Sequence, residues 1–207
     1  MLGPALVLLA YLLGSISFGL IAARRAGVDL RAVGSGNIGA TNVGRALGGR
    51  AGAIVLFLDA LKGLLPVLVA RLAMPGEVVW IAAVGVAAVV GHIAPIWHRL
   101  RGGKGVATAA GVLLVAIPTA GALLALTYFA IRRATRTSSL GSLGGVLVAS
   151  IATIAVGDGR PWPDPPGSRP VLSAFAGVLT VLVFLRHVGN IRRLLAGEEN
   201  IDRTCLP

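Results

Sequence analysis

The sequence predicts an all-α membrane protein, a polytopic bundle of seven transmembrane helices, some short or broken, forming one domain over residues 1–207. Three observations predict this fold. The chain is 56% hydrophobic and 13% charged, whereas about 25% of the residues in a soluble domain are charged. Its mean hydropathy is +0.85, and its apolar residues form runs long enough to cross a bilayer. Most of its basic residues lie in the short loops between those runs, as in multi-pass proteins.

The first four apolar runs place the first part of the bundle. Residues 2–23 are long enough to span the bilayer and lack the basic start of a signal peptide. Residues 52–72 and 78–97 predict two further spans. The run 105–131 is longer than one span requires, and Pro118 lies near its middle. Because an interior proline removes a helical hydrogen bond, we expect two short helices here; one long tilted helix is the alternative.

Residues 140–156 and 171–185 predict the last two spans. Lysine and arginine are concentrated in four clusters, at 24–50, 99–104, 132–136 and 186–193. The positive-inside rule places all four clusters in the cytoplasm. The N-terminus is then outside and the C-terminus is cytoplasmic.

The net charge of +11 raises the question of a nucleic-acid partner. The chain has no basic patch interleaved with aromatic residues, so we expect no nucleic acid; the lipid bilayer and an anionic substrate are the expected partners. Cys205 is the single cysteine, which excludes an internal disulfide and a multi-cysteine metal site. His92, His98 and His187 lack the spacing of metal ligands, so we expect no metal and no cofactor.

A polar loop at 34–45 stands out from the apolar chain. Its glycines allow positive φ and close approach of the backbone to a ligand. Its side-chain donors are Ser35, Asn37, Thr41, Asn42 and Arg45. Backbone N–H groups in such a loop can form an anion-binding concavity, so the loop predicts a phosphate site. A flexible connector between two membrane helices is the alternative.

Three further polar clusters would share the same face of the membrane. Gly102 and Gly103 precede a helix expected to start near Lys104 or Gly105, so backbone donors and an ammonium group can point at one anion. Ser139 and Ser142 lie on one face of a helix. For Ser138 and Ser139, capping of that helix is as good an interpretation as ligand contact. The last cluster contains His187 and Asn190.

Asp59 and Lys62 lie three residues apart on one face of the second span. Ionisable groups at this depth usually face the bundle interior in pairs, so we expect them to neutralise each other. The polar clusters themselves contain cations, hydroxyl groups and backbone donors, without an obvious strong base. Such a site suits a reaction between two phosphorylated molecules, in which catalysis is positioning and charge stabilisation.

Several motifs together resemble one known family. They are Gly14-Ser-Ile-Ser-Phe-Gly19, Ser35-Gly-Asn-Ile-Gly-Ala-Thr-Asn-Val-Gly-Arg45, Gly91-His-Ile-Ala-Pro95, Gly102-Gly-Lys-Gly-Val-Ala-Thr108, Ser139-Leu-Gly-Ser142, and His187 with Asn190. In this order they closely resemble the bacterial acyl-phosphate-dependent glycerol-3-phosphate acyltransferases. The resemblance implies an inner-membrane enzyme with seven helices, an outside N-terminus and a cytoplasmic active site. It also implies transfer of an acyl chain from acyl phosphate to the 1-hydroxyl of glycerol 3-phosphate, without a metal or a carrier thioester. The products would be lysophosphatidic acid and inorganic phosphate, in phospholipid biosynthesis.

The resemblance also implies roles for individual residues. Around glycerol 3-phosphate it places Ser35, Arg45, Lys104, His187 and Asn190. Around acyl phosphate it places Asn37, Ile38, Gly39, Ala40, Thr41, Asn42, Gly102, Gly103 and Lys104. The expected catalytic residues are Lys104, Ser142, His187 and Arg45.

Two other classes of protein would use similar residues. A small anion or phosphate transporter would need the same cations and glycine loops, but such proteins usually show internal repeats and a site at the membrane midplane. A structural membrane subunit would leave the polar loops without a role. The sequence leaves open the acyl-chain preference, the oligomeric state and the spans that line an acyl groove.

Overall fold

The computed structural model describes residues 1–155 and 164–199, and in this part of the chain every regular element is a helix. In chain order the α-helices are α1 (Leu2–Gly14), α2 (Phe18–Arg25), α3 (Ala40–Leu47), α4 (Gly49–Ala73), α5 (Val78–Ile93), α6 (Val106–Ala116), α7 (Pro118–Thr135), α8 (Ser138–Ala155), α9 (Arg169–Arg186) and α10 (Val188–Leu195). One 3-10 turn, Ile96–His98, follows α5. Most of the predicted spans are therefore present with ends shifted by a few residues.

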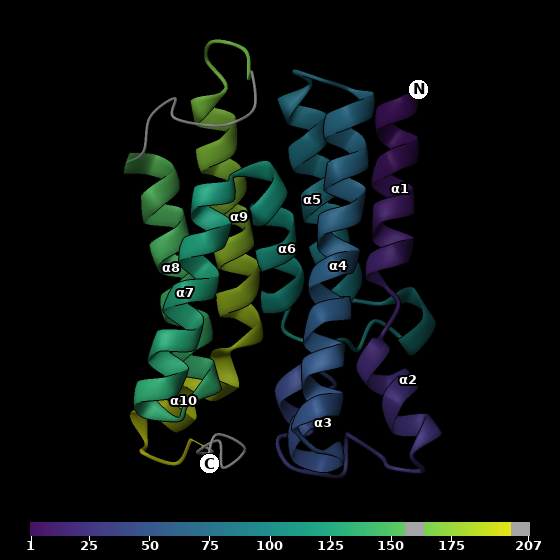
Figure 1. The fold of residues 1–207 in the computed structure, drawn as a ribbon, viewed down its shortest axis with the longest axis vertical. Helices are drawn as coiled ribbons and strands as arrows, with labels where there is room; N and C mark the ends of the chain where they lie inside the picture. The colour runs from purple at the N-terminus through teal and green to yellow at the C-terminus, as the bar shows by residue number, and fades with distance from the viewer. Residues whose placement is uncertain (156–163, 200–207) are drawn as a thin grey trace.

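The long helices stand side by side in a bundle, and α6 lies between the α1, α4, α5 half and the α7, α8, α9 half (Figure 1). The closest packing joins α7 to α8, α1 to α5, and α4 to α6. Small residues permit the α4–α6 contact: a Cβ on Gly63 would collide with the Thr108 carbonyl, and one on Gly111 with the Ala60 carbonyl. Glycine therefore serves close helix packing at these positions.

The predicted break in the run 105–131 is confirmed. Helix α6 ends at Ala116 and α7 begins at Pro118, where a proline fits because the first helical N–H needs no partner. The two helices run in opposite directions, so the chain leaves and returns to the same end of the bundle (Figure 1). The alternative of one tilted helix is wrong.

The predicted span over 2–23 is present as the candidate span Leu2–Arg25, but its helix is interrupted where the chain unwinds between α1 and α2. The Ile16 carbonyl within this break accepts a hydrogen bond of 2.6 Å from Lys62 Nζ. Lys62 also lies 2.8 Å from the carboxylate of Asp59, which confirms the predicted ion pair. The buried ammonium thus has two partners, and one of them is a carbonyl that an unbroken helix would not offer.

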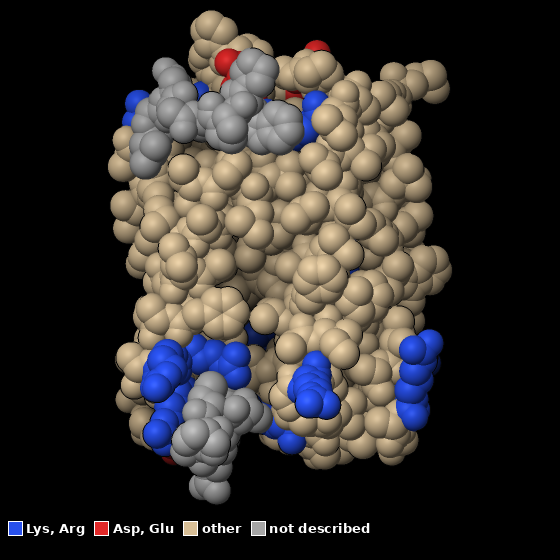
Figure 2. Space-filling view, viewed as in Figure 1, with Lys and Arg blue, Asp and Glu red and all other residues tan. Residues whose placement is uncertain are grey.

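Five helical segments within the described residues are long and apolar enough to cross a membrane, and α6 is shorter. The count of seven spans stays a prediction. The predicted basic clusters do gather at one end of the bundle, the end that holds α2, α3 and α10 (Figure 2). The opposite end has few basic groups, and its buried Arg71 pairs with Asp164.

Candidate active site

A cavity of about 360 Å³ opens near the basic end of the bundle, between α3 and α4 on one side and α7, α8 and α10 on the other. Figure 2 shows a hollow on this face of the molecule. The predicted site residues that line the cavity are Ser35, Asn37, Gly39, Ala40, Thr41, Asn42, Arg45, Lys104, Ser142, His187 and Asn190. Three predicted residues do not line it: Ile38, Gly102 and Gly103. Segments more than 150 residues apart in sequence therefore meet in one cavity.

Lys104 precedes α6 and extends from the glycine turn into this cavity. The pKa of Lys104 is lowered to about 8, chiefly by burial; Glu199 opposes this shift, and the guanidinium groups of Arg193 and Arg45 contribute to it. An ammonium with this pKa is still charged at neutral pH. It is also partly desolvated, so an anion can bind it more strongly than a lysine in water.

The sequence suggested that the backbone N–H groups of Gly102 and Gly103 bind an anion, but in the structure both groups bind backbone carbonyls. The N–H of Gly102 donates to the Ile93 carbonyl at 3.0 Å, and the N–H of Gly103 to the His92 carbonyl at 3.1 Å. Both donors are thus engaged at the end of α5. Glycine is required at 103 for a packing reason, because a Cβ there would collide with the His92 ring.

Arg186, at the end of α9, fixes the same turn from the other half of the bundle. Its Nε donates to the Gly103 carbonyl at 3.1 Å and its guanidinium to the Gly102 carbonyl at 3.0 Å. Arg186 therefore positions Lys104 by holding the backbone that precedes it. The sequence showed Arg186 as one member of a basic cluster, without this partner.

The 34–45 stretch is a loop only up to Gly39, because residues 40–45 already belong to α3. The buried Asn42 side chain holds the loop: its amide donates to the carbonyls of Leu30 and Val33, and its Oδ1 accepts from the N–H of Ser35. The Asn42 side chain therefore stabilises the loop through hydrogen bonds to three backbone groups. Arg45 lies in the last turn of α3 and faces the cavity.

His187 sits between α9 and α10 with almost no exposed surface. Its Nδ1 lies 2.8 Å from the Val183 carbonyl, which can only accept a hydrogen bond. The pKa of His187 is lowered to about 4, chiefly by burial and in part by the charge of Lys104. The imidazole is therefore neutral at pH 7 with its hydrogen assigned to Nδ1, which leaves Nε2 as an acceptor.

Hydroxyl groups connect the two halves of the bundle. Ser138 Oγ lies 3.0 Å from Thr41 Oγ1 on α3 and 2.9 Å from Tyr128 Oη on α7. Ser142 Oγ donates to the Ser138 carbonyl at 2.8 Å. That bond directs the lone pairs of the buried Ser142 hydroxyl away from its own helix, so it can accept a hydrogen bond from a ligand.

Glu199, which the sequence did not single out, is a carboxylate inside this cationic site. Its Oε1 accepts from Ser139 Oγ at 2.8 Å and from Asn190 Nδ2 at 2.5 Å, and its Oε2 accepts from Arg193 at 3.0 Å. Burial raises the pKa of Glu199, but hydrogen bonds from Asn190, Ser139 and Arg193 outweigh burial and keep that pKa below the usual value. The only signal in the sequence was an acidic residue soon after the basic 186–193 cluster.

Asp59 of α4 also lines the cavity. Its carboxylate pairs with Lys62, and His92 Nδ1 lies 3.7 Å from it. All three side chains are buried. The ion pair predicted as a structural element thus forms part of the wall of the site.

The rest of the lining is apolar and comes from α4, α6 and α7. It includes Leu56, Phe57, Leu114, Leu124 and Phe129. Phe57 and Phe129 remain more than half exposed, at 64% and 51%. The cavity therefore has a polar end at the cations and an apolar side that opens toward the outer surface of the bundle.

Comparison with known proteins places this arrangement in one family. A family model described as glycerol-3-phosphate acyltransferase matches residues 4–197. Two curated proteins with that name are similar: one from Anaeromyxobacter sp. (strain K) is 47% identical, covering 96% of each chain, and one from Myxococcus xanthus (strain DK1622) is 49% identical, covering 94% of this chain and 97% of its own.

Two solved structures have the same fold. The crystal structure of PlsY (YgiH), an integral membrane glycerol 3-phosphate acyltransferase, in its glycerol 3-phosphate form is 41% identical with a TM-score of 0.88 over 97% of this chain and 96% of that one. Its lysophosphatidic acid form is 38% identical, with a TM-score of 0.86 over 97% and 95%. The chain belongs to the glycerol-3-phosphate acyltransferase family of integral membrane proteins.

Proposed function

We propose that the protein transfers an acyl chain from acyl phosphate to the 1-hydroxyl of glycerol 3-phosphate, giving lysophosphatidic acid and inorganic phosphate for phospholipid synthesis. One observation carries the proposal: a cavity lined by Lys104, Arg45 and His187 continues into an apolar wall that opens to the side of the bundle. A phosphorylated head group and an acyl chain fit its two parts. Family membership removes the transporter and the structural subunit as alternatives.

Glycerol 3-phosphate would lie among Ser35, Arg45, Lys104, His187 and Asn190, which come from both halves of the bundle. Acyl phosphate would lie against the 37–42 segment and Lys104, with its chain along α4, α6 and α7. Gly102 and Gly103 would shape the turn that carries Lys104, because their N–H groups are engaged with α5.

The reaction needs two anions held close together. The 1-hydroxyl oxygen attacks the acyl carbon, the bond from that carbon to the phosphate oxygen breaks, and the hydroxyl proton leaves on a phosphate oxygen. Acyl phosphate is a mixed anhydride and already activated. The protein therefore has to offset repulsion between the two substrates, and Lys104 and Arg45 are the cations placed to do so.

His187 would orient the hydroxyl through its neutral Nε2. With a pKa of about 4, the imidazole is a weaker base than a phosphate monoester, whose second pKa is about 6. The proton is therefore better accepted by a substrate phosphate than by His187. Ser142 would accept a further hydrogen bond beside the reacting groups.

The active site would face the cytoplasm of a bacterial cell, with the protein in the inner membrane. The support is the concentration of basic residues around the cavity end of the bundle. Cytoplasmic glycerol 3-phosphate would then reach the cavity directly.

The test is an assay with purified protein, acyl phosphate and labelled glycerol 3-phosphate, with labelled lysophosphatidic acid as the readout. Parallel reactions contain acyl-coenzyme A or an acyl-carrier thioester in place of acyl phosphate. We expect product with acyl phosphate alone. Equal or faster product formation with a thioester, and none with acyl phosphate, would show that the donor is wrong while the family assignment stands.

A further inference from the structure

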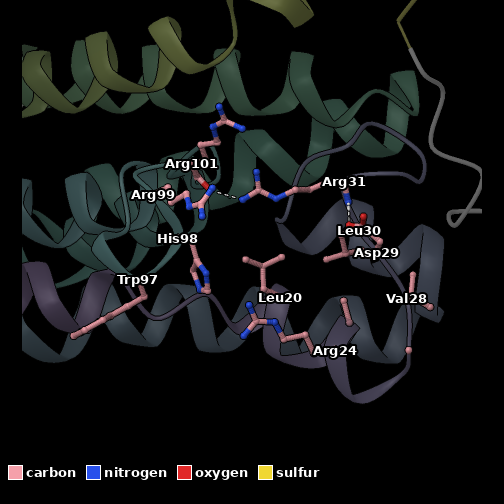
Figure 3. A pocket seen from close by; sticks show the side chains of 12 residues that line it. Leu20, Arg24, Val28, Asp29, Leu30, Arg31, Trp97, His98, Arg99 and Arg101 are labelled. Atoms are coloured by element: carbon pink, nitrogen blue, oxygen red, sulfur yellow. Dashed lines mark hydrogen bonds between the residues drawn. The ribbon is translucent and has the colours of Figure 1, made fainter.

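A second, larger cavity lies at the basic end of the bundle, outside the active site. Its volume is about 650 Å³, and it is formed by α2, the segment after it and the turn after α5. It shares no lining residue with the active-site cavity. Figure 3 shows its polar side chains, which are Arg24 from α2, Asp29 and Arg31 from the segment after it, and His98, Arg99 and Arg101 from the turn.

The charge of this cavity is strongly unbalanced. Four arginines line it, and Asp29 is the one carboxylate among its lining residues. Asp29 accepts a hydrogen bond from the backbone N–H of Arg31 at 2.9 Å, so it serves the local turn. Within residues 1–155 and 164–199, none of the four guanidinium groups forms an ion pair with a carboxylate. An anion entering this cavity meets unneutralised donors.

The turn that carries two of the arginines is held in an unusual conformation. Arg99 and Leu100 are consecutive non-glycine residues with positive φ, at 52° and 60°. Hydrogen bonds to the Pro95 carbonyl from Leu100 and to the His98 carbonyl from Arg101 hold the turn, and Arg31 donates to the Arg101 carbonyl at 3.0 Å. Strained backbone of this kind is concentrated at ligand-binding sites.

The surroundings of the cavity are those of a membrane interface. Trp97 lines the cavity with 61% of its surface exposed, and the neighbouring Ile96 and Leu100 are also more than half exposed. Tryptophan with apolar neighbours beside arginines is typical of the level at which lipid head groups lie. A ligand here can have a phosphate on the arginines and an apolar part along the turn.

We propose that this cavity is a second phosphate-binding site, which takes the phosphate of an anionic phospholipid head group or of a soluble phosphate ester. Arg24, Arg31, Arg99 and Arg101 supply the charge, and planar guanidinium groups bind phosphate oxygens in pairs. Binding at this site does not depend on the proposed acyl donor or on turnover.

The experiment compares two kinds of ligand on purified protein in detergent. Native mass spectrometry counts retained phosphatidylglycerol and phosphatidylcholine, offered at equal mole fraction. Equilibrium dialysis measures labelled inorganic phosphate in a Lys104→Ala background, which weakens binding in the active site. The pocket variant is Arg24→Gln with Arg99→Gln. The matched control is Arg25→Gln, an exposed arginine on the same helix that does not line the cavity.

We expect the pocket variant to bind the preferred ligand about tenfold or more weakly, because two of the four cations that attract the phosphate are removed. The control should match the wild type. Selective loss of phosphatidylglycerol assigns the site to a lipid, and selective loss of inorganic phosphate assigns it to a soluble ester. Equal binding by the wild type and the pocket variant overturns the proposal, as does an equal loss in Arg25→Gln. If the double glutamine variant does not fold, Arg24→Gln alone replaces it, and Arg24→Lys with Arg99→Lys should retain binding.

Discussion

Lys104 is one of two lysines in the chain; Lys62 is buried, whereas Lys104 is half-buried in the wall of the cavity. Lys62 is satisfied by Asp59 and by a carbonyl of the broken first helix. Lys104 instead extends into a cavity whose other basic groups repel it. This contrast shows which of the two ammonium groups is available to a substrate.

Replacing Lys104 by alanine should lower kcat/KM by roughly a hundredfold or more, because one well-placed donor is worth ~3 kcal/mol in the transition state. The measurement is steady-state formation of lysophosphatidic acid by purified protein. Unchanged thermal unfolding in detergent is the control for folding. Near-normal turnover in this variant would remove Lys104 from its central role.

The pKa of Lys104, about 8, predicts a pH dependence. The ammonium is charged below this pH and loses its proton above it, so kcat/KM for glycerol 3-phosphate should fall as pH rises through about 8. Arginine keeps its charge far beyond this range. Lys104→Arg should therefore lose activity at pH 7 from altered geometry, yet show no fall near pH 8. If kcat/KM of the Lys104→Arg variant still falls near pH 8, the group that titrates is not Lys104.

Glu199→Ala should lower the stability of the protein, since it removes hydrogen bonds to Ser139, Asn190 and Arg193 at once. We expect a loss of about 1–3 kcal/mol, seen as a lower unfolding temperature at pH 7. The pKa of this carboxyl is depressed in the folded protein. Its stabilisation is therefore present above the ordinary carboxyl pKa and lost as pH falls below it, so the difference from the wild type should shrink in acid. A difference that grows in acid would contradict this account.

At the level of elements, the close crossing of α4 and α6 sets the position of the cavity. Gly111 of α6 lies against the backbone of Ala60 in α4. Lys104 lies two residues before the first residue of α6. A larger separation of these helices would move the ammonium relative to Arg45. Packing within the membrane and geometry of the site are thus linked.

Gly111→Ala should destabilise the bundle by about 1–3 kcal/mol, because its Cβ would collide with the Ala60 carbonyl and force the helices apart. The matched control is Gly177→Ala in α9, where an added Cβ meets nothing within 4 Å. Thermal unfolding in detergent measures both. Equal unfolding temperatures for the two variants would show that the α4–α6 interface can relax.

For the whole molecule, the sequence predicted the spans and the break at Pro118 because long apolar runs and an interior proline leave few alternatives. It predicted most of the cavity residues through motifs that resemble a family. It did not predict the unwound segment between α1 and α2, because Ile16 and its neighbours carry no strong breaker and the carbonyl partner, Lys62, is remote in sequence. The roles of Glu199 and Arg186 were not predicted for the same reason. Several of their hydrogen-bond partners lie far away in the sequence and come close only in the folded bundle.

The orientation in the membrane is testable with single cysteines. In a Cys205→Ala background, Arg50→Cys lies at the basic end and Pro166→Cys at the opposite end, both at exposed positions. A membrane-impermeant maleimide should label residue 50 in inverted inner-membrane vesicles and residue 166 in intact spheroplasts. The reverse labelling would place the active site outside the cell.

The lateral opening beside Phe57 and Phe129 has a consequence for how the proposed acyl donor would reach the site. A donor that enters from the surrounding leaflet is diluted by neighbouring lipid molecules, whereas bulk water does not dilute it. The rate then depends on the mole fraction of the donor among the lipids of the leaflet, and the concentration of the donor in the whole sample matters less. Added detergent or inert lipid would slow the protein at constant total donor, and a finished lipid could diffuse away without ever crossing an aqueous phase.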